Sequence, residues 1–288
     1  MLIPIKYHNK SYPSHIHPLI DEIAGHFDIS EITPKRKFSL HTEYSYGKRR
    51  LSSITLSMLT SIKQAHSLYV PKLWFSNQWG EEFARFVCLL CNDNQPQIIE
   101  IHPPFSDYTE DIDSFLSIYK VFEGLILAKY PDTEILIENR SGTTYNIGSF
   151  IVSRGRHLLE LCERVDHYNL RLKIALDIPQ LFTAYGGVQK MSPEALIRIL
   201  SSLDPIRKMV RGIHLWGKKR SSAGRLIAHA GDLNTYFEND DKKTVFLEWF
   251  VDYLSDGRER YFVPEVNSLE DDLYSIVSDL EGAGVKFT

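Results

Sequence analysis

Five short apolar segments of this chain each stop at one histidine or carboxylate. In the clearest of them, EILIENRSG (134–142), alternating Ile and Leu residues stop at Glu138 and a Ser-Gly pair follows shortly after. Buried strands end at water or at a site, so a titratable residue at such an end is placed to do chemistry. The other four segments are IIEIHPP with His102, LKIALDIPQ with Asp177, VRGIHLWGK with His214 and YFVPEVNS with Glu265.

Strand-like and helix-like segments alternate about eight times along the 288 residues. Alternation of this kind predicts an α/β fold in which parallel strands are covered by helices. Eight such units favour a closed (β/α)8 barrel, the TIM-barrel fold, formed by one domain that spans residues 1–288. The alternative is an open doubly wound sheet, but no glycine-rich phosphate-binding turn follows the first strand.

The spacing of apolar residues also predicts where the elements lie. Ser192 and Pro193 are expected to start one of the helices, as N-cap and first-turn residues. The second barrel strand is either 28–33 or 38–44, and the pattern leaves both open. The other strands are predicted at 2–8, 70–78, 97–104, 134–138, 171–177, 209–215 and 261–266. Helices are predicted at 17–27, 52–68, 81–91, 111–129, 147–165, 192–203, 244–254 and 269–284.

Composition narrows the class of protein. The chain has 37 acidic and 33 basic residues, a net charge of −4, which argues against a basic coat for packaging DNA. A local basic cleft is still compatible with this balance, because binding follows the field at the site. No run approaches the roughly 18 apolar residues of a membrane helix, and MLIPIKYHNK does not resemble a secretory signal. Three cysteines within apolar patterns fit a reduced, cytoplasmic protein.

In a closed barrel, the five strand-end residues would face one another at the carboxyl-terminal mouth. Three of them are carboxylates, and like charges a few ångströms apart are costly unless a counter-charge is present. A divalent cation supplies that counter-charge. The mixed nitrogen and oxygen donors suit Zn, Mn, Mg or Fe better than Ca.

The motifs around these residues resemble the xylose isomerase-like barrels, a family of sugar isomerases, epimerases and endonuclease IV-type apurinic endonucleases. The resemblance is clearest over residues 97–267. IEIHPP resembles a strand that ends in a metal-binding His, and IENRSG is similar to E-N-x-x-G, whose Glu bridges metals. LDIPQLFTAYG resembles D-x-x-H-x-F-x-x-G, and IHLWGKK resembles H-L-N-D-S-K. The resemblance implies Glu138 and Glu265 as catalytic residues, and as metal ligands His102, Glu138, Asp177, His214, His229 (in AHAGD) and Glu265.

The chain departs from the endonuclease pattern at the positions of a third metal. Gln180 stands where a His would be, and Ile227 where an Asp would precede His229. A His expected one strand before His102 is also missing, because only Asn77 and Gln78 end the predicted strand 70–78. The set Glu138, Asp177, His214 and Glu265 is complete for a single-metal sugar epimerase. One to three ions, with Zn or Mn favoured, therefore fit the chain.

Substrate contacts are expected at the rim of the mouth. The run Lys218, Lys219 and Arg220 follows the His214 strand, with Arg225 beyond it, and is the best candidate for holding phosphate. Gln180 and Asp232 are further candidates for substrate contact. For His41, within SLHTEY, a structural role is favoured over a place at the mouth.

Three functions are compatible with these features. The residues around the predicted ligands, which resemble the endonuclease motifs, favour a metal-dependent phosphodiesterase that acts on DNA or another phosphorylated substrate. The ligand count favours a metal-dependent sugar isomerase or epimerase. A non-catalytic barrel that recognises a partner is the third alternative, although the retained ligands would then have no explanation.

Overall fold

The computed structural model of the protein describes residues 1–43, 50–61, 72–142, 144–145 and 148–288. Eight strands form a closed barrel in which every neighbouring pair is parallel, and β1 pairs with β12 to close the ring. The predicted (β/α)8 TIM barrel is therefore confirmed. The barrel strands are β1 (Leu2–Lys6), β2 (Ile20–Gly25), β3 (Lys37–Thr42), β4 (Ile98–Ile101), β5 (Glu134–Glu138), β8 (Lys173–Asp177), β9 (Val210–Leu215) and β12 (Arg260–Pro264).

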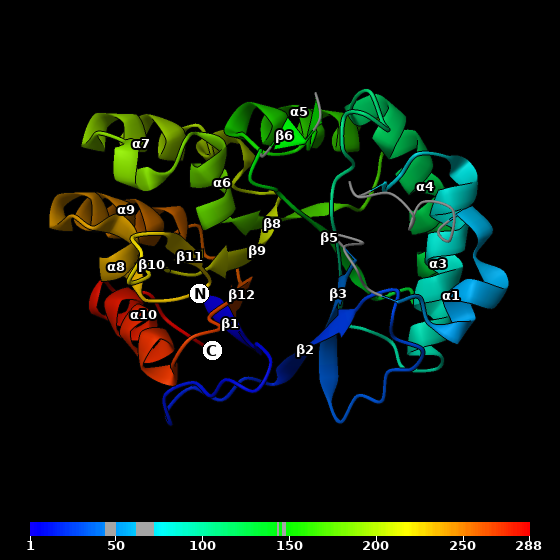
Figure 1. The fold of residues 1–288 in the computed structure, drawn as a ribbon, viewed down its shortest axis with the longest axis horizontal. Coiled ribbons are helices and arrows are strands. Elements are labelled where there is room, and N and C mark those ends of the chain that lie inside the picture. The colour runs from blue at the N-terminus through cyan, green and yellow to red at the C-terminus, as the bar shows by residue number, and fades with distance from the viewer. Residues whose placement is uncertain (44–49, 62–71, 143, 146–147) are drawn as a thin grey trace.

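Helices cover the outside of the ring (Figure 1). Side chains start several of them: Asp111 accepts from the Ser114 amide at the start of α4, and Ser192 with Pro193 starts α7 as predicted. No helix in the described ranges is both long and apolar enough to cross a lipid bilayer. The helices are α1 (Ser53–Met58), α3 (Asn77–Cys91), α4 (Ile112–Lys129), α5 (Gly155–His167), α6 (Ile178–Ala184), α7 (Pro193–Ser201), α8 (Leu233–Phe237), α9 (Asp240–Tyr253) and α10 (Glu270–Gly282), with 3-10 turns η1 (Val188–Lys190) and η2 (Asp204–Ile206).

Two short hairpins lie outside the barrel: β6 (Thr144–Tyr145) with β7 (Gly148–Ser149), and β10 (Lys218–Arg220) with β11 (Leu226–Ala228). The second hairpin follows the end of β9. It therefore carries the basic run 218–220 to the carboxyl-terminal face of the barrel.

A small apolar cluster fills the inside of the barrel and sets which residues face the mouth. Its members include Ile20, Ile98, Leu136, Ala175 and Val263, one from each of five strands. Side chains alternate along a strand, so the residue two positions further also points inward. Those residues are Glu22, Glu100, Glu138, Asp177 and Glu265. The acidic side chains thus lie directly above this apolar cluster, which we name the apolar floor.

The second barrel strand is neither of the two predicted alternatives. Residues 17–27 were expected to form a helix, but Ile20–Gly25 is β2, and 38–44 overlaps β3, the third strand. The apolar spacing in this segment fits a helix only by coincidence. Ile20 faces the inside of the barrel and Ile23 packs against the outer core, as alternation in a strand requires.

Other predicted boundaries also change. No strand lies in the described part of 70–78: residues 72–76 are loop, and Asn77 begins α3 after its cap Ser76. The helix expected at 147–165 begins only at Gly155. The helix expected at 52–68 contains α1, and its residues 62–68 lie outside the described ranges. The remaining predicted strands and helices are present with shifted ends.

An ion pair between the buried Arg260 and the partly exposed Asp256 anchors the start of β12 and gives a test of the fold. Arg260 is fully buried, and its guanidinium donates to both Asp256 oxygens at 2.9 and 2.8 Å. We expect Asp256→Asn to lower the free energy of unfolding by about 2 kcal/mol near neutral pH, because it removes the anionic partner of a buried cation. The measurement is urea unfolding, with Glu259→Gln, an exposed neighbour, as the control.

The same pair predicts a pH dependence. The hydrogen bonds from Arg260 lower the pKa of Asp256 to about 2. A lowered carboxyl pKa stabilises the fold above the unfolded-state pKa and is lost as the pH falls through the folded-state value. The stability difference between wild type and Asp256→Asn should therefore shrink as the pH falls from about 4 toward 2. A difference that stays constant over this range would contradict the role given to the pair.

Candidate metal centre

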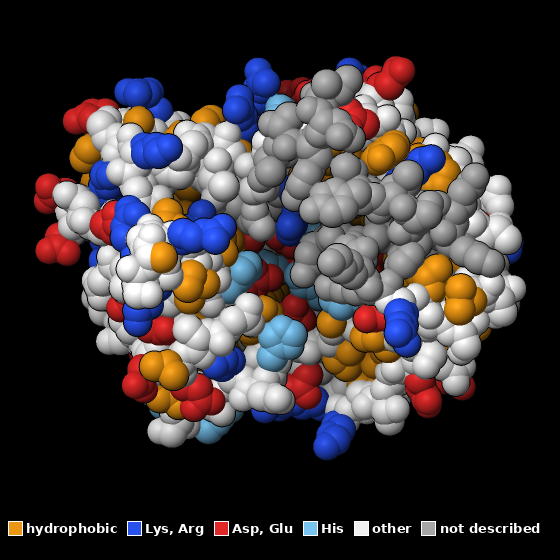
Figure 2. All heavy atoms as spheres, viewed as in Figure 1, with side chains coloured by type: hydrophobic (Ala, Val, Ile, Leu, Met, Phe, Trp, Pro, Cys, Tyr) orange, Lys and Arg blue, Asp and Glu red, His pale blue; other side chains and the backbone are white. Residues whose placement is uncertain are grey.

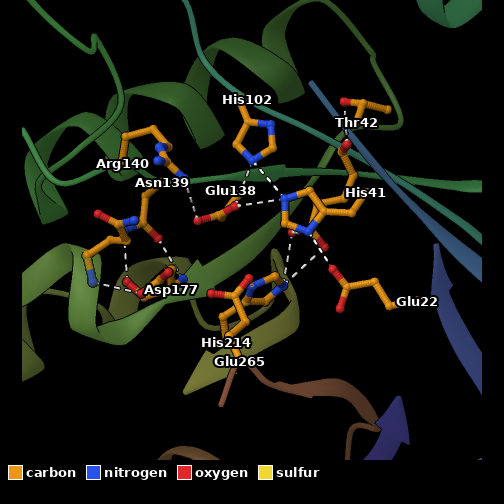
Figure 3. Close-up of polar contacts among 12 residues, drawn as sticks. Glu22, His41, Thr42, His102, Glu138, Asn139, Arg140, Asp177, His214 and Glu265 are labelled. Atoms are coloured by element: carbon orange, nitrogen blue, oxygen red, sulfur yellow. Dashed lines mark hydrogen bonds and ion pairs between the residues drawn. The ribbon is translucent and has the colours of Figure 1, made fainter. Parts of the chain in front are cut away.

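Eight histidine and carboxylate side chains meet inside the barrel where its strands end (Figure 3). Period-two alternation turns each of them inward, above the apolar floor. Their ligand atoms form four overlapping groups of three, and within each group all atoms lie within 4.8 Å of one another. We name the eight residues the mouth cluster: Glu22 of β2, His41 of β3, Glu100 of β4, His102 just after β4, Glu138 of β5, Asp177 of β8, His214 of β9 and Glu265 just after β12.

One side of the mouth cluster holds two histidines and Glu138. Nε2 of His102 lies 2.8 Å from Oε2 of Glu138, and Nε2 of His41 lies 3.1 Å from Nε2 of His102. Oε2 of Glu138 is also 3.6 Å from Nε2 of His41. The other oxygen of Glu138 accepts from the Arg140 guanidinium at 3.2 Å. Two imidazole nitrogens and one carboxylate oxygen therefore converge on a common point, as the ligands of a cation would.

The other side holds Asp177, His214 and Glu265. Nδ1 of His214 lies 3.1 Å from Oε1 of Glu265. Asp177 ends β8 and caps α6: its Oδ1 accepts from the Gln180 amide at 2.7 Å, and its Oδ2 from the Trp216 indole at 3.0 Å. A third group, Glu100 with Glu138 and His214, connects the two sides.

Burial and charge set the ionisation of these groups. Burial lowers the pKa of His102 to about 4, so this imidazole is neutral and able to bind a cation. Burial also raises the pKa of Asp177 well above its usual value, with Glu138 and Glu265 adding like charge. Burial opposes the charge on Glu138, yet Arg140 and His102 hold its pKa well below the usual range. His41 reaches a pKa of about 10, because Glu100, Glu22 and Glu138 outweigh its burial.

Five of the eight residues are carboxylates, and they are enclosed with Arg140. Five carboxyl groups can be ionised together within one buried site only if compensating positive charge is present. The donor set also fits a cation such as Zn or Mn, since it combines imidazole nitrogen with carboxylate oxygen. The residues therefore fit one or more divalent cations.

A cavity of about 180 Å³ lies over the mouth cluster. In Figure 2, histidine and acidic side chains gather in the central hollow of the molecule. The cavity is lined by Tyr7, His8, Glu22, Ala24, His26, His41, Glu138, Arg140, Gln180, His229, Glu265 and Asn267.

Solved structures share this architecture. AsfvAP, in the crystal structure AsfvAP:AG, is similar over 86% of each chain, with 15% sequence identity and a TM-score of 0.55. An L-ribulose 3-epimerase is similar over 92% of this chain and 84% of its own, at 9% identity and a TM-score of 0.47. A xylose isomerase domain protein from Planctomyces limnophilus covers 91% of this chain and 95% of its own, at 13% identity and a TM-score of 0.44.

The similarity to AsfvAP agrees with the closed (β/α)8 TIM barrel seen in the strand topology. No family model matches the sequence, and no curated protein matches it. At these identities a structural likeness establishes the fold alone, and the chemistry depends on the residues of this chain.

Within this barrel, the five strand-end residues picked out from the sequence do come together. His229 lies at the edge of the site: its ring stacks on Trp216 at 4.1 Å, and its Nδ1 is 3.4 Å from Oε2 of Glu265. It belongs to none of the four ligand groups found among the described residues.

The residues predicted to contact substrate form two sets: those near the cavity and those away from it. Gln180 lines the cavity, and the half-buried Lys218 donates to the Thr183 hydroxyl at 2.7 Å. Burial lowers the pKa of Lys218. Lys219 and Arg225 are exposed on the β10–β11 hairpin. Asp232 caps α8 and accepts from Thr235 and Ser275, so its carboxylate is engaged in holding α8 and α10.

The expectation that no histidine stands one strand before His102 is wrong. β3, the barrel strand before β4, carries His41, whose ring stacks on His102 at 5.0 Å. The structural role favoured for His41 is also wrong, because it lines the cavity. The difference arises because the apolar pattern predicts a strand at 70–78, which would take the place of β3 before β4. Glu22 and Glu100 were missed as well, although Glu100 stands two residues before His102 and so must face inward with it.

The mouth cluster predicts that divalent cations stabilise the protein. At a concentration about 100-fold above Kd, a bound ion adds roughly 2.7 kcal/mol, which is about 5–10 °C in Tm for a chain of this length. We expect Zn or Mn to raise the Tm of metal-free protein by this amount. Glu138→Gln should abolish most of the rise, because Glu138 belongs to two of the ligand groups.

Glu123→Gln is the matched control for this melting experiment. Glu123 is also a buried acid, but it accepts from Tyr119 and Arg171, away from the barrel mouth. Its variant should melt earlier and keep the full metal-dependent rise. A wild-type Tm that Zn, Mn and Mg all leave unchanged would contradict the metal centre.

Proposed function

We propose that the protein is a divalent-metal-dependent phosphodiesterase that acts on DNA or another phosphorylated substrate. The observation that carries this proposal is the pair of histidine–carboxylate groups that lie side by side, with Glu138 and Glu100 between them. Two adjacent cations are the arrangement that stabilises both the attacking and the leaving oxygen of a phosphoryl transfer. His41, His102 and Glu138 would hold one ion, and Asp177, His214 and Glu265 the other, with Glu138 facing both.

The bound ions would polarise the phosphoryl oxygen and lower the pKa of an attacking water. Glu265 lies at the cavity wall and would accept a proton from that water, and Glu138 would help to hold it in place. Gln180 and Arg140 also line the cavity and can donate hydrogen bonds to phosphate oxygens. His229 would fix Glu265 from the opposite side, through contacts to its carboxylate and its carbonyl oxygen.

The basic hairpin supports a polyanionic substrate. Lys218 is held near the site by Thr183, and Lys219 and Arg225 extend from the same hairpin into solvent. Lys and Arg side chains in such positions contact phosphates beyond the reacting one.

Cleavage of an abasic duplex tests the reaction. We expect wild-type protein loaded with Zn or Mn to nick the strand at the abasic position, and Glu265→Gln to lower the turnover by about 10²–10⁴-fold, as removal of a general base does. Glu123→Gln should turn over at the wild-type rate. A fully loaded wild type that leaves abasic duplex, nicked duplex and a simple phosphodiester intact would overturn the proposal.

A sugar isomerase or epimerase is the second candidate, favoured by the size of the cavity. Its volume of about 180 Å³ suits a monosaccharide. The set Glu138, Asp177, His214 and Glu265 can hold one cation while two carboxylates move a proton on and off the substrate carbon. Wash-in of deuterium from solvent into a panel of ketoses would favour this reading, and the absence of exchange would exclude it for that panel.

Ionic strength separates the two functions. Each phosphate contact contributes about −0.9 to the slope of log K against log salt for duplex DNA, whereas a neutral sugar gives almost none. We expect Lys219→Ala and Arg225→Ala each to make the slope shallower by about 1, without changing metal content. Arg258→Ala is the control, because Arg258 precedes β12 at the opposite end of the barrel. A slope near zero for every ligand would favour the sugar reading.

A further inference from the structure

We propose that Glu22 and Glu100 are positioning residues, each fixing which ring nitrogen of one histidine faces the cations. Glu22 would orient His41, and Glu100 would orient His214. The inference rests on the proposed metal-dependent function and adds a second layer of carboxylates to it. Neither residue was identified from the sequence; Glu22 lies on β2, where it also lines the cavity, and Glu100 lies on β4.

His41 is held between two different environments. Its Nδ1 lies 2.6 Å from Oε1 of Glu22, while its Nε2 faces His102 and Glu138 at 3.1 and 3.6 Å. If a cation displaces the proton of Nε2, the remaining ring proton stays on Nδ1, because an ionised carboxylate there can only accept a hydrogen bond. The lone pair of Nε2 is then presented to the point where the donors of His102 and Glu138 converge. Metal-bound histidines are commonly oriented by a carboxylate in this way.

His214 shows the same arrangement with its nitrogens exchanged. Its Nε2 lies 3.0 and 3.1 Å from the two oxygens of Glu100, and its Nδ1 lies 3.1 Å from Oε1 of Glu265. If a cation binds on the Nδ1 side, Glu100 would keep the remaining ring proton on Nε2. The Nδ1 lone pair is directed toward Asp177 and Glu265, the other half of the mouth cluster.

Structural roles do not account for these two acids. Glu100 is almost fully buried within the barrel, and neither Glu22 nor Glu100 forms an ion pair with a Lys or Arg among the described residues. Oε2 of Glu22 is buried without a hydrogen-bond partner in that part of the chain. A protein gains nothing in stability from buried acids of this kind. In a metal centre they have a use, since two divalent cations and Arg140 would balance the charge of all five carboxylates.

Metal affinity tests the proposal. We expect Glu22→Leu and Glu100→Leu each to weaken binding of Zn by about 10–100-fold, the usual loss when an orienting partner of a metal ligand is removed. Glu22→Gln and Glu100→Gln should recover part of the loss, because an amide oxygen can still accept from the ring. The measurement is competition between metal-free protein and a chromophoric chelator. Glu123→Leu is the control and should bind Zn as wild type does.

The ring tautomers give a second readout that needs no variant. In Zn-loaded protein labelled with ¹⁵N-histidine, two-bond ¹H–¹⁵N correlation spectra should show the proton of His41 on Nδ1 and that of His214 on Nε2. The opposite tautomer at either residue would overturn the proposal, as would unchanged Zn affinity in the two Leu variants. If a Leu variant does not fold, the Gln variants and the spectra of unmutated protein decide the question.

The outcomes separate this inference from the proposed function. If the wild type cleaves DNA and the Leu variants bind Zn normally, only the positioning roles are disproved. If the Leu variants lose affinity for Zn and the metal-loaded wild type cleaves no phosphodiester, only the phosphodiesterase function is disproved.

Discussion

The structure depends on the cost of bringing five carboxylates together inside a closed barrel. Parallel strands converge at one mouth, and side-chain alternation turns Glu22, Glu100, Glu138, Asp177 and Glu265 inward above an apolar floor. Without positive charge this arrangement would oppose folding. Arg140, His41 and His214 supply part of that charge, and cations would supply the rest. Packing in the rest of the barrel therefore offsets the destabilising effect of the acidic residues at its mouth. This is usual for a site built on a rigid scaffold.

The two sides of the mouth cluster differ in the charge of their side chains, although both lie next to the same cavity. On one side burial keeps His102 neutral, and Arg140 with His102 keeps Glu138 ionised. On the other side Asp177 is crowded by like charge, and His214 is flanked by Glu100 and Glu265. Ions that bind both sides would face the same cavity, with the basic hairpin β10–β11 following directly after β9.

The sequence predicted the barrel and most of its second half because each strand there is a short apolar run that ends in a titratable residue. Glu138, Asp177, His214 and Glu265 could be found in this way. The first third was harder. In β2 the residues Ile20, Ile23 and Ala24 have helical spacing, and only pairing with β1 and β3 makes them a strand. Gly25 fits this pairing, because a Cβ there would lie 2.6 Å from Leu40.

That local error had a consequence for the site. With β2 unrecognised, β3 lost its place in the order of strands, and His41 was not matched to the barrel position before His102. Glu100 was overlooked for a different reason: it lies inside an apolar strand rather than at its end. Period-two alternation from His102 would have indicated it, since both must face the same side. Tautomer and ligand geometry depend on contacts between distant strands, which a single sequence does not contain.

The most direct test of the account is to locate the cations themselves. A crystal of the protein loaded with Zn, measured on both sides of the Zn absorption edge, should give two anomalous peaks per chain. One should lie among His41, His102 and Glu138, and the other among Asp177, His214 and Glu265. Peaks at other residues, or a mouth cluster without any peak at saturating Zn, would contradict the claim that these acids assemble to hold metal.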